Sequence, residues 1–359
     1  MKSRPKALDS VWRIPIIPPF VMQRSASYHP GLAWFSVLAL VFTVFPLAAG
    51  GFTTSIQAGM AFLDWPLSNG SLNPEGWTED PHQLAEHSHR LLAKVLGLIS
   101  IGLVIWTQLV EGRTWVRRLA LGILGMVVFQ GVLGGLRVLL DQLNIQSDHN
   151  LIAQTFAVLH ATSAQIVVML FVALMLSTSR FWIERNAGLT AAVDATTRKW
   201  GIAALAALIL QVVLGAVMRH GHAGLAIPTF PLTPEGGLIP QYWNFAVGIH
   251  FAHRAWAVGV TLILLIFLSR VWKSALTRRA FGWLAILTTF LLSLQIYLGA
   301  LTIWTVKNPH SATIHALMGA ALTAATFAIT FLCHHRPASA PTPAEASKPR
   351  KEENAPALT

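Results

Sequence analysis

Eight apolar stretches of membrane-spanning length constrain this chain more than any other feature of its sequence. They lie near residues 31–51, 85–110, 119–140, 154–179, 200–219, 246–270, 281–304 and 311–333. A helix needs about 20 mostly apolar residues to cross the hydrocarbon core of a bilayer. With 54% hydrophobic and only 11% charged residues, the chain of 359 residues also lacks the polar side chains that a soluble protein would need for its surface. We therefore predict an all-α membrane protein with eight transmembrane helices.

The basic residues indicate how these helices are oriented. The formal net charge is +11, but Lys and Arg gather in the N-terminal arm, the alternate loops and the C-terminal tail rather than on one stripe. The positive-inside rule then places both termini in the cytoplasm. We expect the lipid bilayer, and no nucleic acid, as a partner. A cell inner (plasma) membrane is the expected location, in preference to the mitochondrial inner membrane.

The chain aligns with itself at a shift of 165 positions. Gly50 aligns with Gly215, and Gly134 with Gly299. An even number of spans per repeat keeps the orientation, so we predict two parallel four-helix repeats related by an axis along the membrane normal. We interpret the small residues as places where helices pack closely. The predicted regions are a cytoplasmic N-terminal arm (1–30), the N-terminal repeat (31–179), a cytoplasmic linker (180–199), the C-terminal repeat (200–333) and a disordered cytoplasmic tail (334–359).

Four histidines lie near the outer ends of the second, fourth, sixth and eighth predicted helices: His89, His160, His253 and His315. A histidine inside a membrane is costly to leave unpaired. In a helical bundle a cofactor is held by side chains on facing helices. His89 with His160, and His253 with His315, could each supply the two axial ligands of a haem iron. Each histidine could instead be hydrogen-bonded within the bundle, but the fourfold arrangement favours metal binding. The other outer histidines are expected to face solvent, and these are His82, His87, His149, His220 and His222.

Two similar frames surround the first histidine of each pair, Glu86-His87-Ser88-His89-Arg90 and His250-Phe251-Ala252-His253-Arg254. Residues three and four apart share a helix face, so Glu86, His89 and Arg90 lie together. Arg90 and Arg254 are expected to bind haem propionates, with a lipid phosphate as the alternative. Glu86 has no carboxylate counterpart in the second frame and is a candidate acid or base. Alternatively, it is a helix-terminal acid that the helix dipole favours.

These motifs resemble the haem A synthase family, also called the Cox15/CtaA family. The resemblance covers nearly all of residues 31–333. It rests on the motifs above together with Gly50-Gly51 and Asp64-Trp65-Pro66, a segment with turn chemistry. It implies an oxidoreductase that converts the C8 methyl group of haem O to a formyl group through a hydroxymethyl intermediate, for the cofactor of cytochrome oxidase. It further implies that Glu86, His89 and His160 serve the substrate haem, while His253 and His315 bind a haem b that relays electrons.

The chain departs from one common version of the family, in which an outer loop carries a cysteine pair. Its single cysteine is Cys333, which puts any thiol-mediated step in doubt. Expected partners are haem O, haem O synthase, an electron donor of unknown identity and assembly factors of cytochrome oxidase. Two other functions stay open. One is a dihaem b-type electron-transfer protein, against which Glu86 argues, and the other is a haem carrier or an assembly partner of an oxidase.

Overall fold

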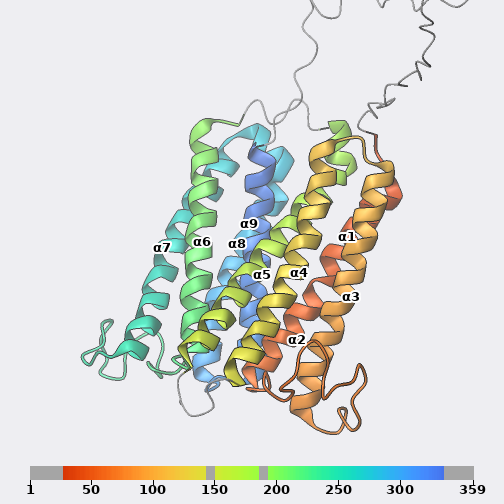
Figure 1. The fold of residues 1–359 in the computed structure, drawn as a ribbon. Helices are drawn as coiled ribbons and strands as arrows, with labels where there is room; N and C mark the ends of the chain where they lie inside the picture. Colours follow the sequence, from red (N-terminus) through yellow and green to blue (C-terminus); the bar gives the residue numbers. More distant parts are fainter. Residues whose placement is uncertain (1–26, 143–149, 186–192, 335–359) are drawn as a thin grey trace, which may run out of the picture.

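The computed structural model describes residues 27–142, 150–185 and 193–334. These residues form nine α-helices and one turn of π-helix, and they contain no strand longer than an isolated bridge. Figure 1 shows the helices as one upright bundle. The elements are α1 (Pro30–Phe42), α2 (Val44–Ser55), α3 (Pro81–Val110), α4 (Thr114–Gln142), α5 (Leu151–Thr178), η1 (Phe181–Arg185), α6 (Ala195–His220), α7 (Phe245–Lys273), α8 (Ala275–Trp304) and α9 (Pro309–His334).

The eight predicted membrane spans are confirmed by helices that are long and apolar enough to cross a membrane. α1 and α2 together form the first span, Pro30–Ser55, and each of the other seven α-helices is one span. The described chain begins and ends at the same end of the bundle (Figure 1), which we call the inner end. The predicted arm and tail lie almost entirely outside the described residues, so the predicted region boundaries stay predictions.

The first span is broken at Thr43 because of Pro46. A proline has no backbone N–H to donate to the carbonyl four residues earlier, and its ring crowds that carbonyl. Here the backbone N–H of Thr43 is shared between the carbonyls of Ala39 and Leu40, at 3.2 and 3.1 Å. The hydroxyl of Thr43 also donates to Leu40 at 2.6 Å. The corresponding span in the second half, α6, has Gln211 at the aligned position and is continuous.

Side-chain caps fix where several helices begin and therefore how deep their residues lie. Asp80 accepts from the backbone N–H groups of His82 and Gln83 at the start of α3. Asn150 caps α5 and Asn244 caps α7 in the same way. Asn and Asp are among the favoured residues at this position because their short side chains reach the unpaired N–H groups of the first turn. These three helices carry His89, His160 and His253, so the caps set the depth of the predicted ligands.

The helices close into two rings of four spans. In the first ring α2 contacts α3, α3 contacts α4, α4 contacts α5, and α5 contacts α1. In the second ring α6, α7, α8 and α9 contact one another in chain order, and α9 returns to α6. The rings meet where α5 contacts α6 and α9 and where α2 contacts α9. α9 is the most buried of the spans.

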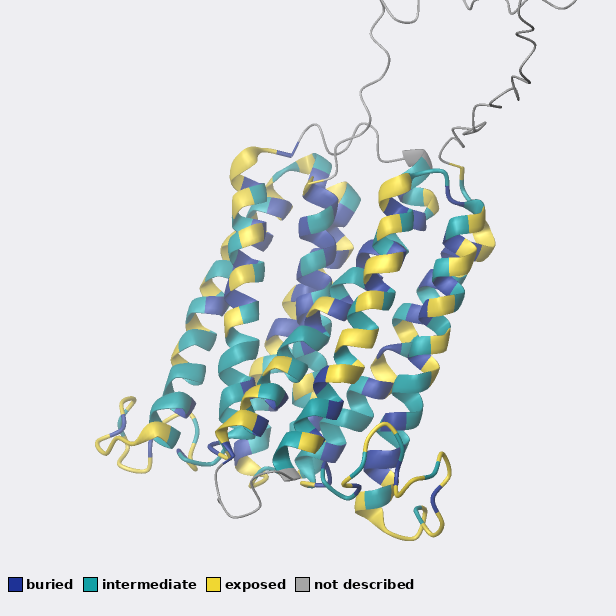
Figure 2. Ribbon diagram, in the orientation of Figure 1, coloured by how far each residue is buried: buried dark blue, intermediate teal, exposed yellow. Residues whose placement is uncertain are grey.

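Apolar cores fill the inner part of both rings. The first core runs from Leu32 on α1 to Leu103 on α3 and Phe171 on α5, and the second includes Leu264 and Phe267 on α7. Figure 2 shows buried residues on the faces that the helices turn toward one another. All these core residues lie nearer the inner end of their helices than the four histidines do.

Candidate functional site

Each of the four predicted ligand histidines lies against a glycine on a neighbouring helix. A Cβ atom added to that glycine would lie within 3.4 Å of the imidazole Cε1 atom in every case. Such contacts are tighter than ordinary van der Waals spacing, so the missing side chain is what makes room for the ring. The pairs, with the distance from the added Cβ to Cε1, are His89 with Gly50 (2.7 Å), His253 with Gly215 (3.0 Å), His315 with Gly299 (3.2 Å) and His160 with Gly134 (3.3 Å).

These contacts give the glycines a role beyond the close helix packing that the sequence suggested. Gly50 and Gly215 align at the shift of 165, as do Gly134 and Gly299. The aligned glycines therefore hold corresponding histidines in both halves. This correspondence supports the predicted repeat.

The N-terminal pair has the spacing that two axial ligands require. The ring centres of His89 on α3 and His160 on α5 are 6.4 Å apart, and the ring planes are nearly perpendicular at 83°. A bond between a metal ion and an imidazole nitrogen is about 2 Å long. Two rings at this separation therefore leave room for one metal atom between them. Among the described residues, no three His, Cys, Asp or Glu side chains gather as a metal centre, so the chemistry offered is that of paired axial ligands.

A hydrogen bond fixes which nitrogen of His89 is left for a metal. Its Nδ1 lies 2.9 Å from the carbonyl oxygen of Pro46 on α2. A carbonyl can only accept, so Nδ1 carries the proton and the neutral ring keeps a free electron pair on Nε2. Metal-binding histidines commonly use the second nitrogen in this way, which fixes the orientation of the ring. His89 therefore fits an axial ligand of haem.

The C-terminal pair is His253 on α7 and His315 on α9, which lie close enough to interact electrostatically. The side-chain amide of Gln211 on α6 lies 3.2 and 3.3 Å from the two ring nitrogens of His253 and donates to its backbone carbonyl at 3.0 Å. Gln211 takes the position that Pro46 has in the first half. The Nδ1 atoms of His160 and His315 are buried, and these rings interact with the backbone of two aligned glutamines, Gln130 and Gln295 respectively.

Glu86 and Arg90 hold the outer loop between α2 and α3. Glu86 is 4% exposed; one carboxylate oxygen pairs with Arg90 at 2.5 Å and the other accepts from the backbone N–H of Phe62 at 3.0 Å. Arg90 also donates to the carbonyls of Phe62 (3.1 Å), Asp64 (2.7 Å) and Leu67. Its guanidinium lies over the Phe62 ring, 5.6 Å from the centroid. The pair thus holds residues 62–67 over the outer end of α3.

The same arrangement recurs between α6 and α7. His250, aligned with Glu86, accepts from the backbone N–H of Ile227 at 3.2 Å and lies 3.1 Å from Nε of Arg254. Arg254 donates to the carbonyls of Ile227 (2.9 Å) and Thr229 (2.6 Å) and lies over the Phe230 ring. A neutral imidazole has one acceptor nitrogen, whereas a carboxylate can accept at both oxygens. Glu86 can therefore accept from the loop N–H and from its arginine at once, whereas a neutral His250 can accept from only one of the two.

These contacts bear on the predicted propionate role of Arg90 and Arg254. Both guanidiniums donate to loop carbonyls, and Arg90 is 9% exposed. The propionate contact stays a prediction, and the loop contacts argue against it. Asp64 behaves as its turn chemistry suggested, because it accepts from the backbone N–H groups of Asn69 and Gly70 at 2.7 and 2.8 Å.

The predicted exposure of His87 was wrong. His87 is fully buried; its Nδ1 lies 2.9 Å from the hydroxyl of Ser68, and its ring centre lies 4.6 Å from that of Trp77. The loop of residues 56–80 folds back over α3 and covers this side chain. His82 and His222 are exposed as predicted, whereas His220 is half-buried, and His149 lies outside the described residues.

One charged residue of this region was missed from the sequence. Arg137 lies on α4, and its guanidinium lies beneath Gly59 of the outer loop. It interacts electrostatically with Glu86, and His160 in turn interacts with Arg137. The signal was available, because an arginine within an apolar span marks a candidate functional residue.

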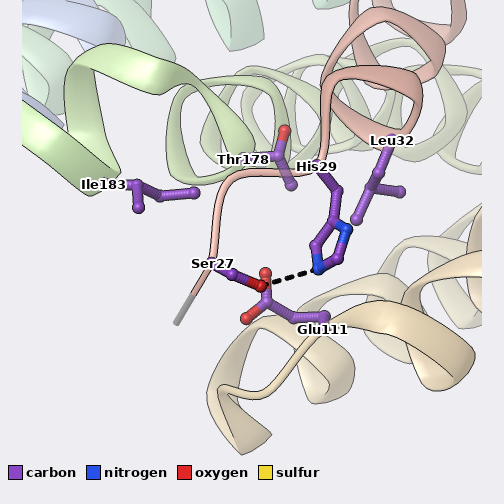
Figure 3. Close-up of a pocket in the computed structure, with 6 residues that line it drawn as sticks. All are labelled: Ser27, His29, Leu32, Glu111, Thr178 and Ile183. Carbon is purple, nitrogen blue, oxygen red and sulfur yellow. Dashed lines mark hydrogen bonds between the residues drawn. The ribbon is translucent and has the colours of Figure 1, made fainter. Parts of the chain in front are cut away.

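A polar pocket at the opposite, inner end is separate from the histidines. Figure 3 shows it between Ser27, His29, Leu32, Glu111, Thr178 and Ile183. Glu111 is 2% exposed and pairs with Arg113 at 2.7 Å, and Arg113 donates to the carbonyl of Ser177. These bonds join the inner ends of α3, α4 and α5. The pocket is part of the inner packing and not of the candidate site.

The chain is similar to known proteins of one family. The model of the COX15-CtaA family, described as cytochrome oxidase assembly protein, matches residues 78–327. A heme A synthase of Symbiobacterium thermophilum is 30% identical over 232 residues, which is 63% of this chain and 69% of that protein. Heme A synthases of Geobacillus kaustophilus and Halalkalibacterium halodurans are 28% and 27% identical over 82% and 81% of this chain, and over 87% and 93% of their own lengths.

Proposed function

Because the chain belongs to the COX15-CtaA family of cytochrome oxidase assembly proteins, we propose that it is a haem A synthase. The proposed reaction converts the C8 methyl group of haem O to a formyl group through a hydroxymethyl intermediate. The observation that carries the proposal is the set of four histidines at similar depth, each beside a glycine, in two corresponding pairs. Paired imidazoles on facing helices suit haem.

The two pairs are proposed to differ in role. His89 and His160 would hold the substrate haem, and His253 and His315 would hold a haem b. When bound, haem b would supply a one-electron relay to the substrate site. The chain's own contribution is to fix the rings. His89 is oriented by Pro46 and Gly50, and His253 by Gln211 and Gly215.

The two halves differ at Glu86, which aligns with His250. This difference supports the proposal that the reaction takes place in the first half. The carboxylate of Glu86 keeps the outer loop in place and lies on the same helix as His89, three residues earlier. A carboxylate three residues from a proposed haem ligand is a candidate general acid or base for a group in the site. We propose that Glu86 is a catalytic residue that also holds the loop, whereas His250 performs only the second task.

We place the protein in the plasma membrane with both termini in the cytoplasm. Eight spanning helices and the bacterial source of the relatives support the membrane, and the charge pattern supports the orientation. Haem O is the proposed substrate, and its supplier, haem O synthase, is a proposed partner. Assembly factors of cytochrome oxidase and an electron donor are further proposed partners.

Extraction and chromatography of the haems tests the proposal. Membranes that contain this protein and a haem O supply should accumulate haem A or its hydroxymethyl precursor. A double variant, His89→Ala with His160→Ala, should leave haem O unconverted and retain haem b. The matched variant of the second pair, His253→Ala with His315→Ala, should lose the low-spin haem b spectrum. Recovery of haem b alone from the unchanged protein would reject the synthase and favour an electron-transfer protein.

A further inference from the structure

The guanidinium of Arg137 lacks a partner in the part of the chain that the structure describes. It makes no hydrogen bond or ion pair with any described residue, although its side chain is half-buried near the outer end of α4. Glu86 is already paired with Arg90 at 2.5 Å. Asp141, one turn further along α4, interacts with Arg137 only electrostatically. A permanently charged side chain in a partly apolar setting is costly unless an anion faces it.

The position of Arg137 on α4 directs it to the N-terminal site. Gly134, three residues earlier, makes room for the ring of His160, and residues three apart share a helix face. Arg137 is therefore about 4.5 Å further along the helix axis than the contact with His160. α4 runs from the inner to the outer end, so the guanidinium lies on the outer side of the paired histidines.

The outer loop closes over Arg137. A Cβ added to Gly59 would lie 2.8 Å from Nη2 and 3.0 Å from Cζ of Arg137, so a side chain there would push the guanidinium away from its present position. At Gly135, two residues before Arg137, the nearest side chain is Trp65. The loop that Glu86 and Arg90 hold thus encloses a cation beside the histidine pair. At Gly224, aligned with Gly59, the nearest side chain is that of Lys307.

We propose that Arg137 binds a carboxylate of the substrate haem and so orients the macrocycle between His89 and His160, an inference that rests on the proposed function. The two propionates are the anionic groups of haem, and a guanidinium forms strong paired hydrogen bonds to a carboxylate. Arg90 has its donors in the loop, whereas the guanidinium of Arg137 makes no hydrogen bond with a described residue and lies near both His89 and His160. The carboxylate edge of the macrocycle would then point to the outer end.

Comparing the binding of haem O with that of its dimethyl ester tests this contact, because the ester lacks the negative charges of both propionates. Absorbance titration of the purified protein, loaded with haem b, gives the affinity for each. The unchanged protein should bind the free acid about 10- to 100-fold more tightly than the ester, as a charge-assisted contact implies. Arg137→Gln should lose most of this preference and Arg137→Lys should keep part of it. Gly59→Ala should weaken the preference while the charge stays, and Arg118→Gln, an exposed arginine on the same helix, should not change it.

Other results would contradict either the role of Arg137 or the proposed function. If Arg137→Gln prefers the free acid as strongly as the unchanged protein, Arg137 does not bind the carboxylate. If Arg137→Gln loses bound phospholipid and keeps its preference for the acid, the partner is a lipid phosphate and the inference fails. If the unchanged protein binds neither form, the proposed function fails together with it. Normal conversion of haem O with no preference between the two forms would remove the inference alone.

Discussion

At the scale of single residues, the candidate sites depend on glycines that lack a side chain as much as on the histidine ligands. In each case a histidine ring on one helix packs against a glycine on a neighbouring helix, and four such pairs occur among the described residues. Interiors are closely packed, so even one added methyl group displaces its neighbour. A displaced ring no longer points its nitrogen at a metal.

The glycines therefore predict a graded series. Gly50→Ala should disturb haem binding most, because its Cβ would lie 2.7 Å from the ring of His89, and Gly134→Ala least, at 3.3 Å from His160. Gly215→Ala and Gly299→Ala should fall between, and should affect haem b instead of haem O. Haem content and low-spin spectra of the purified variants give the order. Gly122→Ala on α4, where an added Cβ meets nothing within 4 Å, is the control. Equal haem retention in all five variants would contradict the assigned role of the glycines.

Two tasks are proposed for Glu86, catalysis and holding the outer loop, and a pair of variants can separate them. Glu86→His copies the second half, where His250 accepts from the loop and lies beside Arg254. We expect this variant to keep haem b and part of the loop structure but to make little haem A, because the carboxylate is gone. Glu86→Gln should behave alike in turnover, and should loosen the loop because the ion pair with Arg90 is lost.

Two measurements on these variants separate the tasks. Haem analysis reports conversion, and hydrogen exchange at Phe62 reports loop order. Haem A formed at the parental rate by Glu86→His would contradict the catalytic role and leave Glu86 as a residue that only holds the loop.

The sequence predicted which residues share a helix face but not what folds over that face. The i,i+4 spacing correctly predicted that Glu86 and Arg90 lie together, because helix periodicity is local. The burial of His87 and the loop contacts of Arg90 depend on how residues 56–80 return to α3. That path depends on contacts between distant parts of the chain, for which a motif carries no signal. Arg137 was missed for a different reason: its place in an apolar span was a usable signal, but it lies near the end of that span, where a single charge resembles an ordinary interfacial residue.

At the scale of elements, all eight spans were predictable because a bilayer demands long apolar helices. Their ends extended beyond the predicted ranges, for example to Pro81 in α3 and Ala195 in α6. Caps such as Asp80 and Asp194 start these helices in polar sequence that a hydropathy pattern leaves out. The break at Thr43 was not predicted, although Pro46 is its physical cause.

The cap of α6 predicts a pH dependence at the inner end. Hydrogen bonds from the hydroxyl and backbone N–H of Thr197, together with the guanidinium of Arg270, hold the pKa of Asp194 at about 2. An unfolded aspartate has a pKa of about 3.9. Because the folded pKa is the lower one, this carboxylate stabilises the fold fully above about pH 4, and the contribution is lost as the pH falls toward 2.

Variants of Asp194 test this dependence through thermal midpoints. Asp194→Ala should destabilise α6 at neutral pH by about 1 kcal/mol, as loss of a helix cap does. The exposed pair with Arg270 should add little. The difference in midpoint between the unchanged protein and the variant should shrink as the pH is lowered below about 4. A difference that grows with acidity would contradict the assignment.

At the scale of the whole molecule, the two rings share several contacts and differ at a few positions. Both place histidine opposite glycine, and both hold the outer loop with an arginine on the helix that follows it. Only the first has a carboxylate at this place, Glu86, and a half-buried arginine at its outer end, Arg137, that makes no hydrogen bond or ion pair with a described residue. The matched contacts support the predicted parallel repeats. The carboxylate of Glu86, which the second ring lacks, is the reason for proposing the first ring as the site of conversion.

The two rings are joined at the depth of the histidines by Arg219. This residue lies at the end of α6 and donates to the carbonyl of Gly51 at 2.5 Å and to the hydroxyl of Ser55 at 2.7 Å, both on α2. Ser55 in turn lies 3.1 Å from the hydroxyl of Thr313 on α9. Gly51 follows the glycine that faces His89, and Thr313 precedes His315 by two residues. A change at Arg219 should therefore reach both sites.

Arg219→Leu is the variant that tests this coupling. Loss of hydrogen bonds from a charged donor should cost about 1.5–3 kcal/mol. It should lower the thermal midpoint and weaken haem retention in the first and second rings together. Arg219→Lys should recover part of both losses, because a lysine can still donate to Gly51 or Ser55. Arg118→Gln, at an exposed position of the inner end, should change neither. If Arg219→Leu lost haem b alone, the residue would belong to the second site, and the two rings would be independent at this contact.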